Sequence, residues 1–370
     1  MSTLAVDAIV DSSNGNTTTI NGATPTTYNT MGKNRIINGA MEIDQRNAGA
    51  SVALNGNEVS VDRWKAQVSV SGKLTAQQST STSVAGFKNY LRMTTSSAYT
   101  PGATESFMMK QNIEGLNCSD LSWGTSDAKT VTLSFWVRSS LTGAFGGAVY
   151  NQAGNRVYPI SYTINSANTW EQKSITITGD TTGTWNTDNS IGITLVFSLG
   201  SGSSMVGTAN VWGSTYYTGS TGQTNLVSNA SATLDITGVQ LEAGSVATEF
   251  ERRLYGTELQ LCYRYFQKFL GSSTYEALPS YVIAGNNTTM AEGFFAYKCT
   301  MRAVPSFSIS TLCLLDAVSV FALSGLTLNA GGVDSSRVIY TGMTGLTTYR
   351  SYYPTAYNST SAYVKLDAEL

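Results

Sequence analysis

The sequence predicts an all-β protein that consists of a jelly-roll β-sandwich and a second, smaller carboxy-terminal β-sandwich domain. Short segments in which apolar and polar residues alternate recur along most of the chain, and turns rich in Gly, Asn and Thr separate them. Such alternation buries one face of each strand and exposes the other, which is the pattern of an antiparallel sandwich. The composition agrees, because charged residues make up only 12% of the chain and Ser, Thr and Asn take their place.

The strands of the predicted jelly roll lie between residue 34 and about residue 255. In 130–138 the alternate apolar side chains face one way, and Trp136 points outward or into a second layer. Roughly eight to ten strands separated by turns fit a jelly-roll pair of sheets, and the sequence leaves their order open. The further strands that we expect span 62–70, 90–95, 106–111, 145–150, 171–178, 191–199 and 233–242.

A single helix, at 256–270, is expected to link the two β domains. Apolar side chains at 259, 262, 263 and 266 recur at the spacing i, i+3, i+4 and i+7, with no Gly or Pro between them. Gly256 and Thr257 precede this run and provide an N-cap for the helix.

The carboxy-terminal β domain is expected to span 271–370. Alternation resumes there at 293–299, 306–312, 338–341 and 362–367. The segment is rich in Tyr and has no Trp, whereas all six Trp residues of the chain lie between residues 64 and 212. This shift in composition over about 100 residues predicts a separate domain of common size.

The amino-terminal segment, 1–33, has few large apolar residues and many Asn, Gly and Thr residues. Such a segment cannot bury enough apolar surface to fold alone. We therefore expect it to find its partners in other chains, as a short oligomeric attachment segment.

The composition also excludes several classes of function. Because the chain has no His, it cannot form a Ser-His-Asp triad, a Cys-His dyad or an imidazole-bound zinc site. A net charge of −2 without any basic run argues against nucleic-acid binding, which requires Lys and Arg gathered on one face. The longest apolar runs are shorter than the ~18 residues that a spanning helix needs, so we expect no membrane insertion.

Paired carboxylates are the one catalytic arrangement that the composition leaves open, since glycosidases use two of them a few ångströms apart. None of the candidates lies in a recognisable catalytic motif, and most lie in turn-like contexts in which a carboxylate bonds to its own backbone. We therefore predict that the protein is not an enzyme. The candidates are Asp62, Glu105, Asp180, Asp188, Glu242, Glu249 and Glu251.

No cofactor is expected. The turns at 179–183 and 186–189 carry Asp and Asn side chains whose oxygens could serve a calcium ion, which takes six to eight such ligands. The spacing of an EF-hand loop is absent from both turns. Plain turn chemistry explains the same residues, and a structural calcium ion stays as the alternative.

Aromatic residues in loops rich in Gly, Ser, Thr and Asn are the candidate glycan- or receptor-binding residues. A ring covers the apolar side of a pyranose while neighbouring amides and hydroxyls hold the sugar hydroxyls. Packing at hinges and contact between chains are the competing structural interpretations. The candidates are Trp185, Trp212, Tyr216, Tyr217, Tyr352 and Tyr353.

A series of motifs, in order between residues 34 and 266, resembles a bacteriophage tail-fibre domain. The match is specific because the motifs occur together and in sequence, although Tyr263 stands where Gln is expected before Arg-Tyr. The segments MRAVP at 301–305 and LDAEL at 366–370 are similar to the carboxy-terminal parts of such fibres. The motifs are NRIINGAM at 34–41, IDQR at 43–46, VDRW at 61–64, LSFWVRS at 133–139, NTWE at 168–171, GDTTGTW at 179–185, ITGVQLEAG at 236–244, ATEFERR at 247–253 and ELQLCYRYF at 258–266.

The resemblance implies a homotrimeric, non-enzymatic fibre of the virion with a carbohydrate-binding-like jelly roll. Such a fibre adsorbs to host cell-surface polysaccharide or lipopolysaccharide, and three copies of a weak site gain avidity. It would be assembled in the host cytoplasm, attach to other tail proteins through 1–33 and carry its receptor-binding tip in 271–370. A head fibre or capsid-decoration protein with a purely structural role is one alternative, and a polysaccharide depolymerase with paired carboxylates is another.

The charged and aromatic residues inside these motifs are expected to be structural. Charges of both signs lie near the predicted ends of strands, where buried charges must pair. Any receptor site should then lie in the loops outside the motifs. The expected structural residues are Asp62, Arg63, Trp64, Trp136, Glu251 and Arg252.

Overall fold

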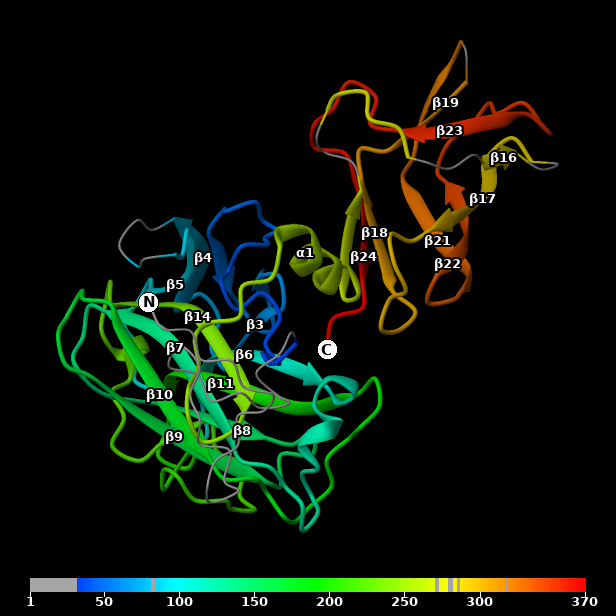
Figure 1. Ribbon diagram of the computed structural model, residues 1–370. Helices are drawn as coiled ribbons and strands as arrows, with labels where there is room; N and C mark the ends of the chain where they lie inside the picture. Colours follow the sequence, from blue (N-terminus) through cyan, green and yellow to red (C-terminus); the bar gives the residue numbers. More distant parts are fainter. Residues whose placement is uncertain are drawn as a thin grey trace, which may run out of the picture. The chain divides into compact units, whose positions relative to one another are not determined.

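The structure is a computed structural model that describes residues 32–80, 84, 86–269, 273–278, 282–284, 287–316 and 318–370. Of the predicted attachment segment, 1–33, all but the last two residues lie outside this part of the chain. The described residues form two compact units (Figure 1). The amino-terminal unit comprises the described residues of Met1–Glu42, Ser51–Glu58 and Lys65–Arg253, and the carboxy-terminal unit those of Ile43–Ala50, Val59–Trp64 and Leu254–Leu370.

The amino-terminal unit is a sandwich of two sheets with antiparallel neighbours, as the alternating pattern predicts. The first sheet has the strand order β1 (Val52–Leu54), β4 (Leu74–Thr80), β5 (Asn89–Thr95), β14 (Thr233–Ala243), β7 (Val131–Ser139) and β10 (Glu171–Ile177). The second sheet contains, side by side, β3 (Trp64–Val68), β6 (Ser106–Glu114), β11 (Ile191–Ser201), β8 (Gly143–Tyr150) and β9 (Val157–Ile164). Short strands β12 (Val206–Gly207) and β13 (Gly219–Ser220) pair in parallel.

The core of this unit lies between the two sheets. Phe135 on β7 packs edge-on against Phe197 on β11 and Tyr162 on β9, with ring centroids 5.0 and 5.1 Å apart. Leu133, Phe135 and Val137 have no exposed surface. The prediction that the alternate side chains of 130–138 face the core is therefore confirmed, and Trp136 between them is half-buried on the other face.

The sequence prediction missed two long strands of this unit, β4 and β9. Strand β9 contains Pro159, which cannot donate a hydrogen bond to a neighbouring strand and so argues against a strand. The structure tolerates Pro159 because β9 is the last strand of its sheet: its only strand partner there is β8, and on the other side the Pro159 carbonyl accepts a hydrogen bond from the Asn210 N–H in a loop, at 2.8 Å. Strand β4 ends in Gln, Ser and Thr, and its outward polar positions hide the alternation.

Two short segments within the predicted jelly-roll range, 43–50 and 59–64, cluster with the carboxy-terminal unit. The second of them contains β2 (Val59–Val61). Alternation along a strand shows that one face is buried, and it does not show which part of the chain buries it. The sequence pattern therefore does not predict that 43–50 and 59–64 belong to the carboxy-terminal unit.

The predicted helix starts within one residue of the observed one, but its N-cap residue is Leu254, so that Gly256 and Thr257 lie inside the helix, and the predicted end is wrong. Helix α1 covers Tyr255–Tyr263, and the chain then forms strand β15 (Phe266–Phe269) where 256–270 was expected to stay helical. β15 pairs antiparallel with β24 (Tyr363–Asp367), and Phe266 and Phe269 are both buried. A helix and a strand would both bury Phe266, so the apolar spacing alone does not decide between them. The pairing with β24 decides in favour of the strand.

The carboxy-terminal unit is also all-β apart from α1. A three-stranded sheet has the order β15, β24 and β18 (Ser306–Ser310). The apolar core of the carboxy-terminal unit includes Val282, Phe295, Leu314, Tyr340 and Tyr352. A seven-stranded sheet has the order β20 (Val320–Ala322), β19 (Cys313–Leu315), β23 (Ser351–Thr355), β16 (Val282–Ala284), β17 (Met290–Ala296), β22 (Ser335–Thr341) and β21 (Gly325–Gly331).

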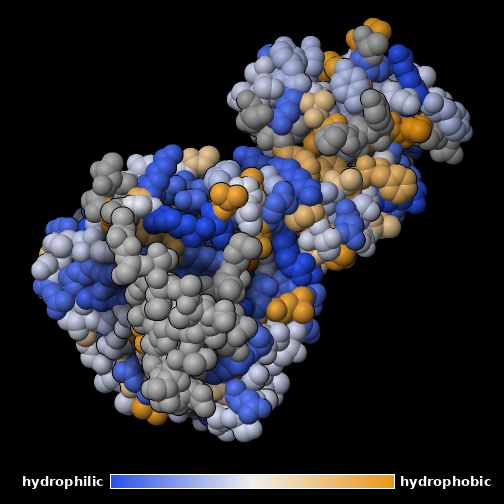
Figure 2. All heavy atoms as spheres, in the orientation of Figure 1, coloured by the Kyte–Doolittle hydropathy of each residue, from blue (hydrophilic) through white to orange (hydrophobic). Residues whose placement is uncertain are grey.

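Hydrophobic side chains reach the surface of this unit in several patches (Figure 2). Phe294 on β17 is 74% exposed and Ile283 on β16 is 52% exposed, and both point away from the core side chains Phe295 and Val282. No helix in the described part of the chain is both long and apolar enough to cross a lipid bilayer.

Candidate functional site

A cavity of about 250 Å³ opens on the outer face of the second sheet of the amino-terminal unit. Its floor comes from alternate positions of adjacent strands, and the residues between them, such as Ala66, Met109 and Leu195, are fully buried in the core. We call this site the outer-face cavity. It is lined by Gln67, Lys110, Asn112, Tyr150, Gln152, Ala153, Gly154, Ile191, Thr194 and Tyr216.

Polar contacts arrange the floor of the outer-face cavity. The Lys110 ammonium donates a hydrogen bond to the side-chain amide oxygen of Gln67 at 2.7 Å. The Thr194 hydroxyl donates to the Asn112 carbonyl oxygen at 2.9 Å. Burial and, to a smaller extent, the positive charge of Lys65 together lower the pKa of Lys110 to about 8. Lys65 on β3 lies directly opposite Lys110 on β6.

One wall is the turn between β8 and β9. The side-chain amide oxygen of Gln152 accepts hydrogen bonds from the Asn186 side-chain amide at 2.7 Å and from the Ile191 backbone N–H at 3.1 Å. The side-chain NH₂ groups of Gln67 and Gln152 have no hydrogen-bond partner among the described residues. Both amides therefore keep donors that a ligand in the cavity can use.

The aromatic wall is Tyr216, which packs edge-on against Tyr150 with ring centroids 5.3 Å apart. The Tyr216 hydroxyl donates a long hydrogen bond, 3.4 Å, to the Tyr150 hydroxyl. Gly154 permits this packing, because a Cβ there would lie 2.9 Å from the Tyr216 ring and its φ is +64°. Burial raises the pKa of Tyr150 well above its ordinary value, so this phenol stays neutral.

Of the predicted binding aromatics, Tyr216 alone is among the residues that line the outer-face cavity. Tyr217 packs next to it against a small apolar cluster on the same sheet face that includes Met108, Val157 and Val196. These contacts hold the loop before β13 on the sheet and fix Tyr216 at the cavity.

The structure brings Trp185 and Trp212 together with Trp123, which the sequence prediction did not include. The three indoles pack edge-to-face, with ring centroids 4.7, 5.5 and 5.6 Å apart. The Trp212 N–H donates to the Thr178 carbonyl at 2.8 Å, and the Trp123 N–H to the Lys129 carbonyl at 2.7 Å. Such geometry matches the structural interpretation, in which rings and N–H groups are used in packing.

This tryptophan cluster braces the cavity wall indirectly. Asp180 accepts two hydrogen bonds from the Arg156 guanidinium, at 2.8 and 2.7 Å, and a third from the Trp185 N–H at 3.2 Å. Arg156 ends the turn that carries Gln152 and Gly154. The ion pair therefore positions the wall, and the hydrogen bonds from Arg156 and Thr182 lower the pKa of Asp180 in spite of its burial.

Tyr352 and Tyr353 do not lie in a loop, and that part of the prediction is wrong. Both are on strand β23 of the carboxy-terminal unit. Tyr352 is 1% exposed, packs edge-on against Phe321 and accepts a hydrogen bond from the Thr347 N–H. Two adjacent Tyr residues followed by Pro354 break the alternation that marks a strand.

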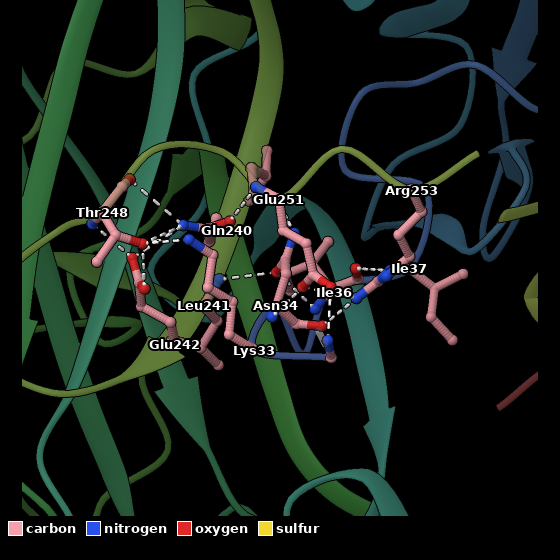
Figure 3. A network of polar contacts seen from close by, with 12 residues as sticks. Lys33, Asn34, Ile36, Ile37, Gln240, Leu241, Glu242, Thr248, Glu251 and Arg253 are labelled. Carbon is pink, nitrogen blue, oxygen red and sulfur yellow. Dashed lines mark hydrogen bonds and ion pairs between the residues drawn. The ribbon is translucent and has the colours of Figure 1, made fainter. Parts of the chain in front are cut away.

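The motif residues of the amino-terminal unit form a hydrogen-bond network around Glu251 (Figure 3). Its carboxylate accepts hydrogen bonds from the Gly32 and Asn34 N–H groups at 2.6 and 2.7 Å. Its own N–H donates to the Gln240 carbonyl oxygen at 2.8 Å. The Asn34 side chain accepts from the Ile36 N–H and the Leu241 N–H and donates to the Val239 carbonyl. The network fastens 32–37 to β14, and we name it the motif network.

Two other predicted structural residues, Arg252 and Trp136, also make contacts within the amino-terminal unit. The Arg252 guanidinium donates to the Gly86 carbonyl and lies 4.5 Å from the Phe87 ring centroid. Trp136 packs against Gly238, whose φ is +59°, and a Cβ at Gly238 would lie 3.2 Å from the indole. Both contacts are intramolecular packing.

Asp62, Arg63 and Trp64 belong to the carboxy-terminal unit. The Asp62 carboxylate accepts hydrogen bonds from the Gln45 backbone and side chain at 3.1 and 2.6 Å, and Trp64 is fully buried. Burial raises the pKa of Asp62 to about 6, against the lowering effects of Arg46 and of the Gln45 hydrogen bonds.

Arginines tie this motif to the end of the chain. Arg63 forms an ion pair with Glu369 and lies 3.4 Å from the Tyr265 ring centroid. Arg46 pairs with Asp367 at 2.5 Å and with Glu369 at 3.1 Å. The motifs at 43–46, 61–64 and 366–370 thus form one ion-pair cluster within the carboxy-terminal unit.

Six of the seven carboxylates considered for catalysis accept hydrogen bonds from neighbouring groups of the scaffold, and the seventh, Glu249, is exposed. The lining of the outer-face cavity contains no carboxylate. Asp188 accepts hydrogen bonds from Ser190, Glu242 from Thr248, and Glu105 from the Tyr99 hydroxyl at 2.9 Å. In the described part of the chain, no group of three or more Cys, Asp or Glu side chains could hold a metal ion. The Arg156 guanidinium beside Asp180 also disfavours a cation at the 179–183 turn.

Sequence reasoning missed most of the cavity residues. Lys110, Asn112 and Thr194 alternate with apolar residues on β6 and β11, yet an outward polar residue is the default on any half-buried strand. Only the pairing of β3, β6, β11 and β8 brings these positions together. The adjacent Tyr216 and Tyr217 were the one feature of the sequence that pointed to this site, and of the two Tyr216 lines it.

Comparisons with known proteins give a fold likeness alone. No protein-family model matches the chain, and a search of curated proteins finds no match either. Similar solved structures include the enzymatically active domain of tailspike protein 4 of bacteriophage CBA120, at 12% identity and TM-score 0.31 over 57% of this chain and 22% of that one. At this coverage the match spans less than a quarter of the tailspike chain.

Two carbohydrate-binding modules are also similar. The family 11 module of a cellulase from Clostridium thermocellum has 13% identity and TM-score 0.27, over 54% of this chain and 99% of that one. TmCBM61 in complex with β-1,4-galactotriose has 11% identity and TM-score 0.26, over 49% and 88%. Likenesses this weak carry no functional conclusion, and the function must be argued from the site itself.

Proposed function

We propose that this protein is a non-catalytic glycan-binding fibre of a virion and that the outer-face cavity of the amino-terminal unit is its glycan site. The observation that carries the proposal is a concave site on an outer sheet face, where amides, a hydroxyl, an amine and a Tyr ring converge. Ligand sites combine such a hollow with a few placed polar groups and an aromatic surface.

The chemistry of the cavity suits a sugar. Sugar hydroxyls both donate and accept hydrogen bonds, and the unused NH₂ groups of Gln67 and Gln152 offer donors. The Tyr216 ring offers an apolar face for the C–H groups of a pyranose. The volume of about 250 Å³ lies just below the range of about 300–1,000 Å³ for drug-sized ligands, which suits a short stretch of a longer glycan.

The same lining favours binding over hydrolysis. Glycoside hydrolysis needs two carboxyl groups on either side of the scissile bond. The residues that line the cavity provide no carboxyl group. Asp180 and Glu242, two of the carboxylates considered for catalysis, bond to neighbouring side chains of the scaffold. The proposal therefore assigns no catalytic residue.

The fibre role is supported by the resemblance and by what the motifs do in the structure. The motif network and the ion-pair cluster hold chain segments together, which leaves recognition to residues outside the motifs. We propose a homotrimer that attaches to other tail proteins through 1–33 and carries 271–370 as its distal part. The exposed Phe294 and Ile283 support association, since exposed apolar patches mark interaction surfaces.

An array of purified bacterial surface polysaccharides and lipopolysaccharides tests the proposal with the full chain. Wild type should bind a subset of the glycans, and Gln67→Ala should lose most of that binding. Gln172→Ala is the matched control, because Gln172 is exposed on a strand of the other sheet. No binding by wild type would contradict the glycan role and favour a structural head fibre, and release of reducing sugar would favour a depolymerase.

A further inference from the structure

We propose that the outer-face cavity selects an anionic glycan and that the ammonium group of Lys110 binds a sugar carboxylate or phosphate there. This inference rests on the proposed glycan function and specifies the class of glycan. Three observations carry it: the partner of Lys110, the charge opposite it, and the charge of the remaining lining.

Lys110 has an incomplete set of partners. Its ammonium has three donors, and among the described residues it donates to the neutral carbonyl oxygen of Gln67. No carboxylate in the described part of the chain forms an ion pair with Lys110. A half-buried cation that is bonded to a neutral amide alone remains available to an oxyanion that enters the cavity.

The strand pairing adds a second positive charge. Lys65 on β3 lies directly opposite Lys110 on β6 in the antiparallel register, so both side chains point to the same sheet face. Like charges at directly opposed positions destabilise a sheet. An oxyanion beside Lys110 would offset this repulsion, and it would also offset the desolvation that lowers the pKa of Lys110.

The remaining lining does not oppose an anion. The other residues of the outer-face cavity carry amide, hydroxyl, phenol or apolar side chains, and none carries a carboxylate. A neutral sugar would leave Lys110 desolvated without a counter-charge, and an acidic sugar would supply one. Discrimination between otherwise identical sugars by charge follows from this difference.

The charge of Lys110 also sets a pH dependence. The titratable groups that face it are Lys65 from β3, Tyr150 from β8 and Tyr216 from the loop before β13. Burial keeps Tyr150 neutral, and Lys110 loses its charge as the pH rises through its pKa of about 8. Binding of an anionic glycan should therefore weaken from about pH 7 to about pH 9, and binding of a neutral glycan should not.

Calorimetric titration of the full chain with three matched probes tests the inference. The probes are oligogalacturonate, its carboxyl-reduced neutral form, and that neutral form phosphorylated at O6. At least one acidic probe should bind roughly tenfold more tightly than the neutral one, and the better acid identifies the oxyanion. Lys110→Met should abolish the preference, whereas Lys110→Arg should retain most of it.

Lys88→Met is the control for net charge, because Lys88 is exposed in the same unit and lies away from the cavity lining. Thermal unfolding should show that Lys110→Met is no less stable than wild type, since the substitution removes a like-charge pair. Equal affinity for acidic and neutral probes, or a preference that survives Lys110→Met, would overturn the inference while glycan binding stands. If none of the three probes binds, the inference fails, and the polysaccharide array decides separately on glycan binding.

Discussion

The amino-terminal unit contains two polar clusters that use similar residues in opposite ways. In the motif network, Asn34 makes three side-chain hydrogen bonds, and both Glu251 carboxylate oxygens accept backbone N–H groups. In the outer-face cavity, the amides of Gln67 and Gln152 each keep an NH₂ group without a partner among the described residues. Saturated polar groups hold a scaffold together, and unsaturated ones at a hollow can recognise a ligand.

The contrast accounts for which residues belong to the family-like motifs. Asn34, Gln240, Glu251 and Arg253 all lie in motifs, and they fasten one chain segment to another. None of the polar residues of the cavity floor lies in a motif. The following predictions test whether the two clusters differ as strongly in stability and in binding as they do in geometry.

The largest effect is expected in the motif network. Asn34→Ala should lower the free energy of unfolding by about 3 kcal/mol, because it leaves the buried Ile36 and Leu241 N–H groups without their acceptor. Chemical denaturation measures the change, with Gln172→Ala as the control. Glycan affinity per folded molecule should stay at the wild-type value. A loss of stability below about 0.5 kcal/mol would show that the network is not a scaffold.

The second effect is a pH dependence in the carboxy-terminal unit. The folded-state pKa of Asp62 is raised from 3.8 to about 6, so its contribution to stability is fully present below about pH 4 and is lost as the pH rises through about 6. Asp62→Asn should remove this dependence. The difference between the unfolding free energies of variant and wild type should therefore shift by about 2 kcal/mol in favour of the variant between pH 4 and pH 7.

Denaturation of both proteins at a series of pH values measures this difference. A difference that is constant with pH would mean that Asp62 titrates as it does in the unfolded chain. The other carboxylates contribute equally to the two proteins and cancel in the comparison.

The third effect concerns the aromatic wall of the outer-face cavity. Tyr216→Ala should weaken glycan binding by roughly tenfold, because the ring supplies the apolar contact surface. Tyr216→Phe should retain most of the affinity, since the hydroxyl makes only one hydrogen bond, which is 3.4 Å long. Titration calorimetry separates the two variants, and equal losses would show that the hydroxyl, not the ring face, is the binding element.

The smallest effect tests the support of that ring. Gly154→Ala should cost about 1 kcal/mol of stability, the usual penalty for a non-Gly residue at positive φ, and should also weaken binding by displacing Tyr216. Gly222→Ala is the matched control, because Gly222 has φ +81° and its added Cβ would meet no atom within 4 Å. Identical effects of the two substitutions on binding would separate Gly154 from the site.

The sequence predicts the fold class better than it predicts the site. Alternation along 130–138 identifies β7 and its buried face because packing on a sheet depends on local pattern. The same reasoning extends the helix through Phe266 and overlooks β9, since pairing with β24 and an edge position decide these two segments. Local pattern also gives no sign that 43–50 and 59–64 belong with the end of the chain.

The site depends on the order of strands, which no local pattern encodes. Aromatic residues in polar loops led to Tyr216, but also to Trp185 and Trp212, whose rings pack against each other, and to Tyr352, which is in a core. Lys110 and Gln67 lie 43 positions apart in the sequence and meet through the pairing of β3 with β6. Their juxtaposition is a property of the fold.

The most direct test of the central claim is a crystal structure of the full chain with the oligosaccharide that it binds most tightly. The account predicts electron density for the sugar in the outer-face cavity, against Tyr216 and within hydrogen-bonding distance of Gln67 and Lys110. Density at the tryptophan cluster or in the carboxy-terminal unit, with the outer-face cavity left free of sugar, would contradict it.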